Sequence, residues 1–145
     1  MRDPAITSHI MSAVRNRDTK PEVILRRALW GSGMRYRLRS QLIGKPDIIF
    51  PGAKVAVFVD GDFWHGNAWR VRHMASFEEQ FERWNNPNFW RNKILANMKR
   101  DETVNEVLRS SGWMVYRVFE SRLTEDVDRV VDEIRMLVEE GRRHR

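Results

Sequence analysis

Acidic residues and a histidine gather in the sequence around the ends of two predicted strands. Asp47 opens a short strand after Gly-Lys-Pro, and Asp60, Asp62 and His65 follow the apolar run 55–59. The hairpin that joins these strands would bring its ends together, so we expect one acidic pocket with a histidine beside it. Carboxylates of this kind suit Mg²⁺, which polarises a phosphate and activates water. A histidine is the side chain best suited to take the proton from that water near neutral pH.

Each of these residues also has an ordinary structural interpretation. An aspartate at the start of a strand is often a turn residue, and Asp60-Gly61 is a common turn dipeptide. Glu22 stands where the capping box Thr19-Lys-Pro-Glu needs a glutamate. His65 alone is more often a hydrogen-bonded surface histidine than a base. Only the combination of these residues supports a catalytic site.

The elements that must position these residues can be inferred from the spacing of apolar residues. A helix is expected after the capping box, ending at Gly31 or Gly33, and a long one opens at Asn86-Pro87, with Gly112 just beyond its end. A last helix is expected from Thr124. The remaining expectations are one or two helical turns at 8–15, an antiparallel meander of strands at 34–38, 47–50 and 55–59, loops with a short helix at 60–86, and a strand at 113–118. This order predicts an α/β fold, a mixed sheet flanked by helices.

Composition limits the class of protein. The chain has 145 residues, enough for one domain over 1–145, in which we expect the segment 1–15 to be flexible. Its net charge of +6 is uneven, because residues 1–72 hold 13 Lys and Arg against 6 Asp and Glu. A basic front half is typical of nucleic-acid binding, although it also serves solubility. No apolar stretch is long enough to span a bilayer, so a cytoplasmic protein without membrane contact is expected.

Five landmarks in order make the chain similar to a known family. The sequence contains Arg17-Asp-Thr19, Lys45-Pro-Asp47, Phe58-Val-Asp-Gly-Asp-Phe-Trp-His65, Asn88-Phe-Trp90 leading to Asn97-Met-Lys-Arg-Asp101, and Gly112-Trp113 before Val118-Phe-Glu120. These landmarks, within Met11–Leu123, resemble the very-short-patch repair endonucleases. Members of that family nick duplex DNA at T·G mismatches and belong to the restriction-endonuclease-like group.

The resemblance implies a role for each matching position. Asp47 matches the metal-binding aspartate, and Val59 matches the residue whose backbone carbonyl also meets the metal. His65 matches the histidine that acts on the attacking water, and Asp101 its carboxylate partner. Glu22 matches a glutamate that orders metal-bound waters. The catalytic residues expected are therefore these four side chains, with Mg²⁺ as the cofactor.

The resemblance also implies contacts with double-stranded DNA. Phe63, Trp64 and Trp90 match aromatic residues that wedge into the duplex beside the mismatch, although core packing is an equally good interpretation of Trp90. Basic residues are candidates for phosphate contacts, and these are Arg15, Arg17, Arg35, Arg37, Lys45 and Lys54. Duplex DNA is the expected partner, and we expect the segment 1–15 to contact it. The protein is expected to be a monomer, and other mismatch-repair proteins are candidate partners.

The sequence departs from the family in two places. The chain has no cysteine, and Asp62, Asn67 and Ser121 stand where the best-studied branch has zinc ligands. A structural Zn²⁺ is therefore not expected, and packing by residues such as Trp69 or Phe77 would have to hold the loop. Asp60 replaces a histidine and is a candidate second metal ligand. These departures keep hydrolysis but weaken the case for T·G specificity.

Three interpretations remain open from the sequence. The first is a Mg²⁺-dependent endonuclease that nicks T·G mismatches, with Asp47, Val59 and His65 at its centre. The second is a homing or defence endonuclease of the same chemistry that does not read mismatches. The third is a DNA-binding or protein-binding module without catalytic activity.

Overall fold

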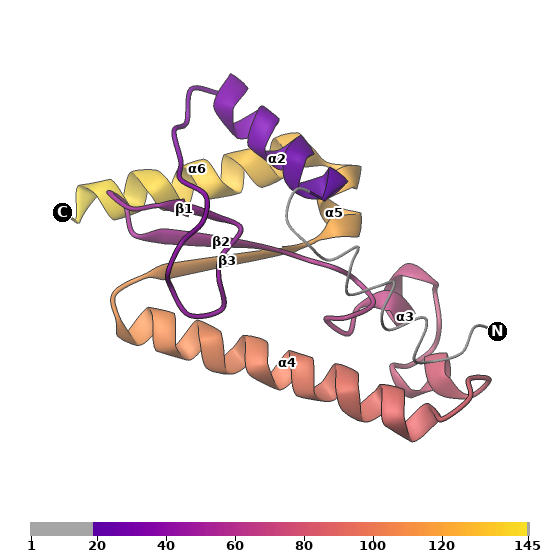
Figure 1. Cartoon of the computed structure of the whole chain (residues 1–145). Coiled ribbons are helices and arrows are strands. Elements are labelled where there is room, and N and C mark those ends of the chain that lie inside the picture. The colour runs from indigo at the N-terminus through magenta and orange to yellow at the C-terminus, as the bar shows by residue number, and fades with distance from the viewer. Residues whose placement is uncertain (1–18, 145) are drawn as a thin grey trace.

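A computed structural model describes residues 19–144, which form a mixed α/β fold around a three-stranded sheet (Figure 1). The strands are β1 (Ile48–Phe50), β2 (Val55–Asp60) and β3 (Met114–Phe119), in the order β1-β2-β3. β1 and β2 pair antiparallel across a tight turn, and β2 pairs parallel with β3. The expected α/β class with a mixed sheet is confirmed.

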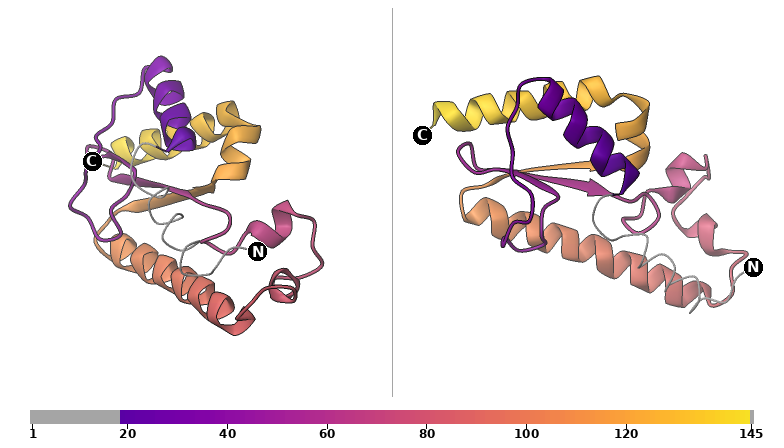
Figure 2. Two further views of the ribbon diagram at one scale, coloured as in Figure 1. Left: turned by 45° about the vertical axis from the view of Figure 1, so that its right-hand side comes forward. Right: turned by 45° about the horizontal axis from the view of Figure 1, so that its top comes forward.

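Helices cover both faces of the sheet. α2 (Lys20–Gly31), α5 (Glu120–Glu125) and α6 (Val127–Arg143) lie on one side, and the long α4 (Pro87–Ser110) lies on the other (Figure 2). The connection from β2 to α4 contains α3 (Ala68–Val71) and the 3₁₀ turn η1 (Glu78–Phe81). The parallel pairing of β2 with β3 requires such a crossover, and α4 is its helix.

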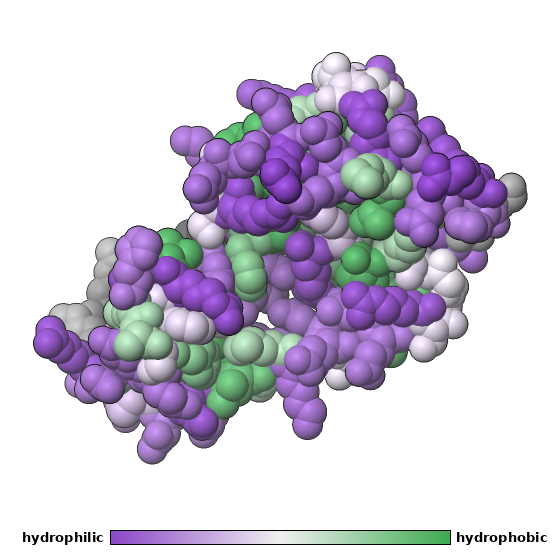
Figure 3. All heavy atoms as spheres, turned by 180° about the vertical axis from the view of Figure 1, so that it is seen from behind, coloured by the Kyte–Doolittle hydropathy of each residue, from purple (hydrophilic) through white to green (hydrophobic). Residues whose placement is uncertain are grey.

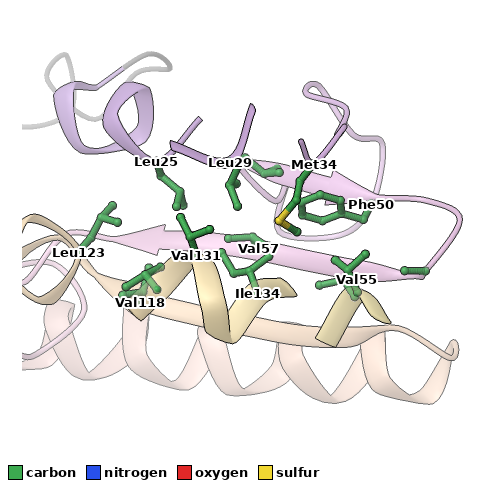
Figure 4. Packing of buried hydrophobic residues seen from close by; sticks show 14 residues of the cluster. Leu25, Leu29, Met34, Phe50, Val55, Val57, Val118, Leu123, Val131 and Ile134 are labelled. Carbon is green, nitrogen blue, oxygen red and sulfur yellow. The ribbon is translucent and has the colours of Figure 1, made fainter. Parts of the chain in front are cut away.

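The alternation of side chains along β2 divides the core into two layers. Val55 and Val57 pack with Leu25, Leu29 and neighbours from α6, and these side chains interdigitate in Figure 4. Ala56 and Phe58 point to the opposite face and pack against α4. β2 is therefore apolar from Val55 to Val59 because both faces of the strand are covered, as its sequence predicted. Its last residue, Asp60, falls on the face that meets α4.

Two sequence predictions differ from the structure. Residues 34–38 do not form a strand, because only Arg37 makes a bridge, to Ile49 of β1. The last helix does not run unbroken from Thr124, because Asp126 interrupts it and its side chain caps α6 by accepting the Arg129 N–H. The predicted helical turns at 8–15 lie outside the described residues. None of the helices within 19–144 is both long and apolar enough to cross a membrane.

Candidate active site

A cleft of about 960 Å³ opens where β2 and β3 end and β1 begins. β1 runs antiparallel to β2, so the residue before β1 and the residues after β2 meet at the same edge of the sheet. The first turn of α2, the middle of α4 and the loop 61–67 complete the walls. The space-filling view in Figure 3 shows the molecule hollowed near its centre, with hydrophilic and hydrophobic side chains around the hollow.

The cleft holds an acidic pair, Glu22 and Asp47. Glu22 serves the expected capping box, since its Oε2 accepts the Thr19 N–H at 3.0 Å and lies 3.6 Å from Arg26 Nη2. Asp47 Oδ2 accepts the backbone N–H of Val59 at 2.7 Å. Burial, followed by the hydrogen bond and negative charge of Glu22, raises the pKa of Asp47 to about 8. The pair is thus a site where negative charge is concentrated and poorly solvated.

A second group of charges lies beside this pair and joins β2, β3 and α4. His65 Nδ1 lies 2.5 Å from Asp101 Oδ2 and 3.8 Å from Asp60 Oδ1. Arg117 Nη1 lies 3.1 Å from Asp60 Oδ1 and 3.4 Å from Asp101 Oδ1. One ligand atom from each of Asp60, His65 and Asp101 lies within 4.8 Å of the others, close enough for a shared metal ion. Burial raises the pKa of Asp60, while His65 and Arg117 oppose that rise. We call Asp60, His65, Asp101 and Arg117 the charged quartet.

Hydrogen bonds hold the loop 61–67, which carries the aromatic residues and His65. Asp62 Oδ1 accepts from Asn67 Nδ2 at 2.8 Å and from Ser121 Oγ at 2.7 Å. The Ser121 N–H donates to Asp62 Oδ2 at 3.1 Å. The positions matched to zinc ligands therefore bind one another directly. We expected packing by Trp69 or Phe77 to hold the loop. The hydrogen bonds of Asp62 also hold it, and these were not predicted from the sequence.

The loop also approaches α4 closely. Gly66 has a φ of 81°, and a Cβ at this position would collide with the Met98 sulfur. Asn97 Nδ2 donates to the Trp64 carbonyl at 3.2 Å. Glycine is therefore needed where the loop turns against the helix.

The three candidate wedge residues lie in one aromatic cluster. Trp64 and Trp90 are only 3% and 2% exposed, whereas Phe63 is half-buried. Phe63 stacks on Trp84 with ring centroids 5.4 Å apart, and Trp64 and Trp90 meet at 6.0 Å. In this structure both candidate tryptophans are packing residues. Phe63 lines the cleft, and so does one edge of Trp64.

The basic candidates are divided between the cleft and other surfaces. Lys45 lines the cleft, whereas Arg35 stacks on Trp30 at 3.8 Å and Lys54 lies in the turn between β1 and β2. Arg15 and Arg17 lie outside the described residues. Several other basic residues line the cleft but were not predicted from the sequence, and these are Lys20, Arg26, Arg39, Arg72, Arg100 and Arg117.

The structure brings the sequence-predicted residues together. Glu22, Asp47, Val59, Asp60, His65 and Asp101 all line the same cleft, although they are separated by up to 79 positions in the chain. Arg117 and Glu120 also line the cleft, and no role was predicted for either residue from the sequence. Arg117 is a lone charge inside an apolar strand, and Asp101 and Asn105 face it from one side of α4, four residues apart. That spacing was a usable signal for a polar site facing the strand.

Comparisons with known proteins agree on one family. The family model for the DNA mismatch endonuclease Vsr matches residues 1–71. A type II nicking enzyme of Haemophilus parainfluenzae is 42% identical over 71% of this chain and 69% of its own length. A type II nicking enzyme of Neisseria meningitidis serogroup C is 38% identical over 88% and 82% of the two chains. The DNA mismatch endonuclease Vsr of Escherichia coli is 32% identical over 85% and 74%.

Proposed function

The chain belongs to the DNA mismatch endonuclease Vsr family and is a DNA endonuclease. We propose that it nicks one strand of duplex DNA at T·G mismatches and uses Mg²⁺ as its cofactor. One observation carries the proposal: the contact of His65 with Asp101 lies in the same cleft as the buried pair Glu22 and Asp47. A base held by a carboxylate beside a concentrated negative charge is the arrangement that metal-assisted hydrolysis of a phosphodiester requires. Membership of an endonuclease family sets aside the non-catalytic module.

The acidic pair fits a divalent cation. Asp47 and Glu22 are hard oxygen donors, Glu22 buried and Asp47 half-buried, and the pKa of Asp47 rises chiefly because burial disfavours its charged form. We propose that the Asp47 carboxylate and the Val59 carbonyl hold Mg²⁺, with Glu22 beside them. When bound, the cation polarises the phosphate and lowers the pKa of the attacking water. Asp60 is a further candidate ligand, but its carboxylate is engaged by Arg117.

His65 is the proposed general base. Its Nδ1 faces Asp101, so a proton on Nδ1 is held by the carboxylate and Nε2 keeps a lone pair. Asp101 thereby selects the tautomer in which Nε2 can accept the proton of the attacking water. It also favours the imidazolium that forms when that proton has moved.

Phosphate binding is proposed for the basic residues around the cleft. Lys45 stands two residues before Asp47 in the chain, and Arg39, Arg72 and Arg100 also line the cleft. Arg15 and Arg17 are proposed as further contacts from the N-terminal segment. Neutralising several phosphates would make duplex binding fall steeply as salt rises.

The aromatic cluster is proposed to read the mismatch. A T·G pair is easier to unstack than a matched pair, and an inserted aromatic ring replaces the lost stacking. Phe63 needs only a small movement to reach the duplex, since it is half-buried at the cleft. Trp64 and Trp90 reach DNA only if the cluster opens, because both are almost fully buried.

The order and pairing of the strands and helices support the same proposal. An antiparallel hairpin that carries an acidic residue at each end, followed by a helix and a parallel strand, is consistent with a restriction-endonuclease-like core. We propose that 1–145 is one endonuclease domain, acting as a monomer in the cytoplasm where its DNA substrate lies. Other mismatch-repair proteins remain candidate partners.

A nicking endonuclease without mismatch reading is the second candidate. Two observations favour it: the relatives named above include type II nicking enzymes, and Trp64 and Trp90 are buried rather than displayed. This candidate uses the same metal site and the same base, so only the substrate distinguishes it.

The deciding experiment is strand nicking of end-labelled duplexes that are identical except for one T·G pair. Each duplex is tested with Mg²⁺ and with chelator, using the wild type, Asp47→Ala and the control Asp128→Ala, which changes an exposed carboxylate on α6. Mismatch-selective, Mg²⁺-dependent nicking that Asp47→Ala abolishes supports the first candidate. Equal nicking of both duplexes supports the second. Nicking that persists in chelator contradicts both.

A further inference from the structure

Arg117 is the one charged side chain on the inward face of β3 that contacts two carboxylates of the described cleft. It pairs across the parallel ladder with Phe58, and its guanidinium lies 4.0 Å from the centre of that ring. Asn105 Oδ1 accepts from Arg117 Nε at 2.6 Å. The side chain is therefore held from the sheet and from α4 at once, and it is fixed in position before any substrate binds.

The terminal nitrogen Nη1 of Arg117 contacts both carboxylates of the charged quartet. Nη1 donates to both oxygens of Asp60, at 3.1 and 3.2 Å, and lies 3.4 Å from Asp101 Oδ1. The other oxygen of Asp101, Oδ2, faces His65 Nδ1. Each oxygen of Asp101 thus has its own partner, and rotation of the carboxylate away from His65 would break the contact with Arg117.

The position of the guanidinium also bears on metal binding. Asp60, His65 and Asp101 offer three ligand atoms to a shared ion. An ion bound through Asp60 and Asp101 would need to lie about 2.1 Å from an oxygen of each. Arg117 Nη1 lies near that place, and its positive charge would repel a divalent cation. The quartet therefore already contains the cation that its two carboxylates need.

We propose that Arg117 is a positioning residue: it supplies the positive charge of the Asp60–His65–Asp101 group in place of a metal ion and so holds Asp101 against His65. This inference rests on the proposed role of His65 as the base and adds a residue that the sequence resemblance did not assign. It implies that Asp60 is not a metal ligand in this enzyme, and that metal binds only at Asp47 and the Val59 carbonyl, beside Glu22.

The first test counts Mn²⁺ ions bound to the DNA-free protein, by electron paramagnetic resonance and isothermal titration. Asp60→Asn should leave the number of bound ions at the wild-type value, whereas Arg117→Gln should add one ion per chain. The double variant Arg117→Gln, Asp60→Asn should return to the wild-type number. Loss of an ion in Asp60→Asn, or an unchanged number in Arg117→Gln, would overturn the proposal.

The second test separates positioning from folding. Arg117→Gln should lower kcat about 10- to 100-fold with little change in KM, as expected when the partner of a base is released. Arg117→Lys keeps the charge and should recover at least part of that loss and bind the wild-type number of Mn²⁺ ions. An equal loss of kcat in both variants, with unchanged melting temperatures, would contradict the proposal.

These readouts remain informative if one variant does not fold or if the proposed function fails. If Arg117→Gln does not fold, Asp60→Asn in the wild-type background still decides whether Asp60 holds an ion. Failure of the proposed metal site would appear as wild-type Mn²⁺ binding that Asp47→Ala does not reduce. That result differs from any change caused by Arg117 or Asp60.

Discussion

Glu22 and Asp47 lie at the first turn of α2 and the start of β1, whereas Asp60 and Asp101 lie on the side of the sheet that faces α4. Both groups place carboxylates at the end of β2 and remove them from water. In the first, the pKa of Asp47 rises to about 8 although Arg26 lies 3.6 Å from Glu22. In the second, Arg117 donates directly to Asp60.

This difference matches the proposed arrangement, in which a metal binds on one side of the cleft and a base lies on the other. Burial and the neighbouring Glu22 both disfavour the charge of Asp47, so a bound cation would stabilise it, and the acidic pair supplies the oxygen donors for that cation. Asp60 and Asp101 both contact a built-in guanidinium that offsets part of their charge, and Asp101 can serve to orient a histidine. The following predictions test whether the two groups are as distinct as their contacts indicate.

The largest effect is expected from removal of the metal-binding carboxylate. Asp47→Ala should reduce the nicking rate by about 10³-fold or more, because stabilisation of developing charge is the largest contribution to such a reaction. It should also weaken Mn²⁺ binding to the free protein. Single-turnover nicking and titration measure the two effects. A rate within about tenfold of the wild type would remove the acidic pair from the chemistry.

The next largest effect is expected on the side of the charged quartet. His65→Ala should lower kcat by about 10²- to 10⁴-fold without weakening Mn²⁺ binding, since the base lies apart from the acidic pair. Asp101→Asn should lower kcat less, because the imidazole remains but its tautomer is no longer selected. Steady-state kinetics with metal titration checks both. Loss of metal binding in His65→Ala would mean that the two groups form one site.

A pH effect on stability should distinguish the acidic pair in the absence of metal. The pKa of Asp47 is about 8 in the folded chain and near 3.8 when unfolded, so the folded state binds the extra proton between these values. Stability should therefore fall as pH rises from about 4 to 8, with the melting temperature dropping over this range in chelator. Asp47→Asn should reduce this drop, and saturating Mg²⁺ should also reduce it.

Part of that pH dependence should survive in Asp47→Asn. The pKa values of Asp60 and Glu120 are also raised, in both cases chiefly by burial, so each destabilises the fold when it ionises. A variant with no remaining pH dependence would show that these two carboxyls contribute nothing. Calorimetric scans at pH 5, 6.5 and 8 provide the comparison.

A smaller effect is expected from the hydrogen bonds that hold the loop 61–67. Asp62→Ala removes the acceptor of three hydrogen bonds and should lower the free energy of unfolding by about 1–3 kcal/mol. Ser121→Ala should cost less, and the matched control Ser111→Ala, at an exposed helix end, should cost least. Chemical denaturation measures all three. Equal stability of Asp62→Ala and the wild type would show that packing alone holds the loop.

The smallest effect is expected at the rim of the cleft. Lys45→Ala should reduce the slope of log K against log salt concentration for duplex binding by about 1, with little change in kcat. Lys54→Ala is the matched control, because this lysine lies in the turn between β1 and β2, away from the cleft lining. Identical slopes for the two variants would place the DNA elsewhere on the surface.

Much of the fold followed from local chemistry. The capping box at Thr19, the proline after Asn86 and the continuous apolar run of β2 each depend on neighbours within a few residues, so their elements were predicted correctly. The segment 34–38 was wrongly predicted to be a strand. Its apolar and polar residues alternate, but a strand also needs a neighbouring strand to pair with along its length, and only Arg37 makes such a bridge. The break at Asp126 was missed, although an aspartate is a common helix cap.

The sequence by itself determined which residue types were available for chemistry: Asp47, His65 and Asp101 within familiar landmarks, an excess of positive charge, and no thiol. The tertiary structure alone decided which of them meet. Arg117 contacts Asp60 across 57 positions and Ser121 contacts Asp62 across 59, and no local pattern encodes such a pairing. The reason is physical: the free energy of a buried charge depends on the groups that surround it in space, and chain folding brings those groups together from distant segments.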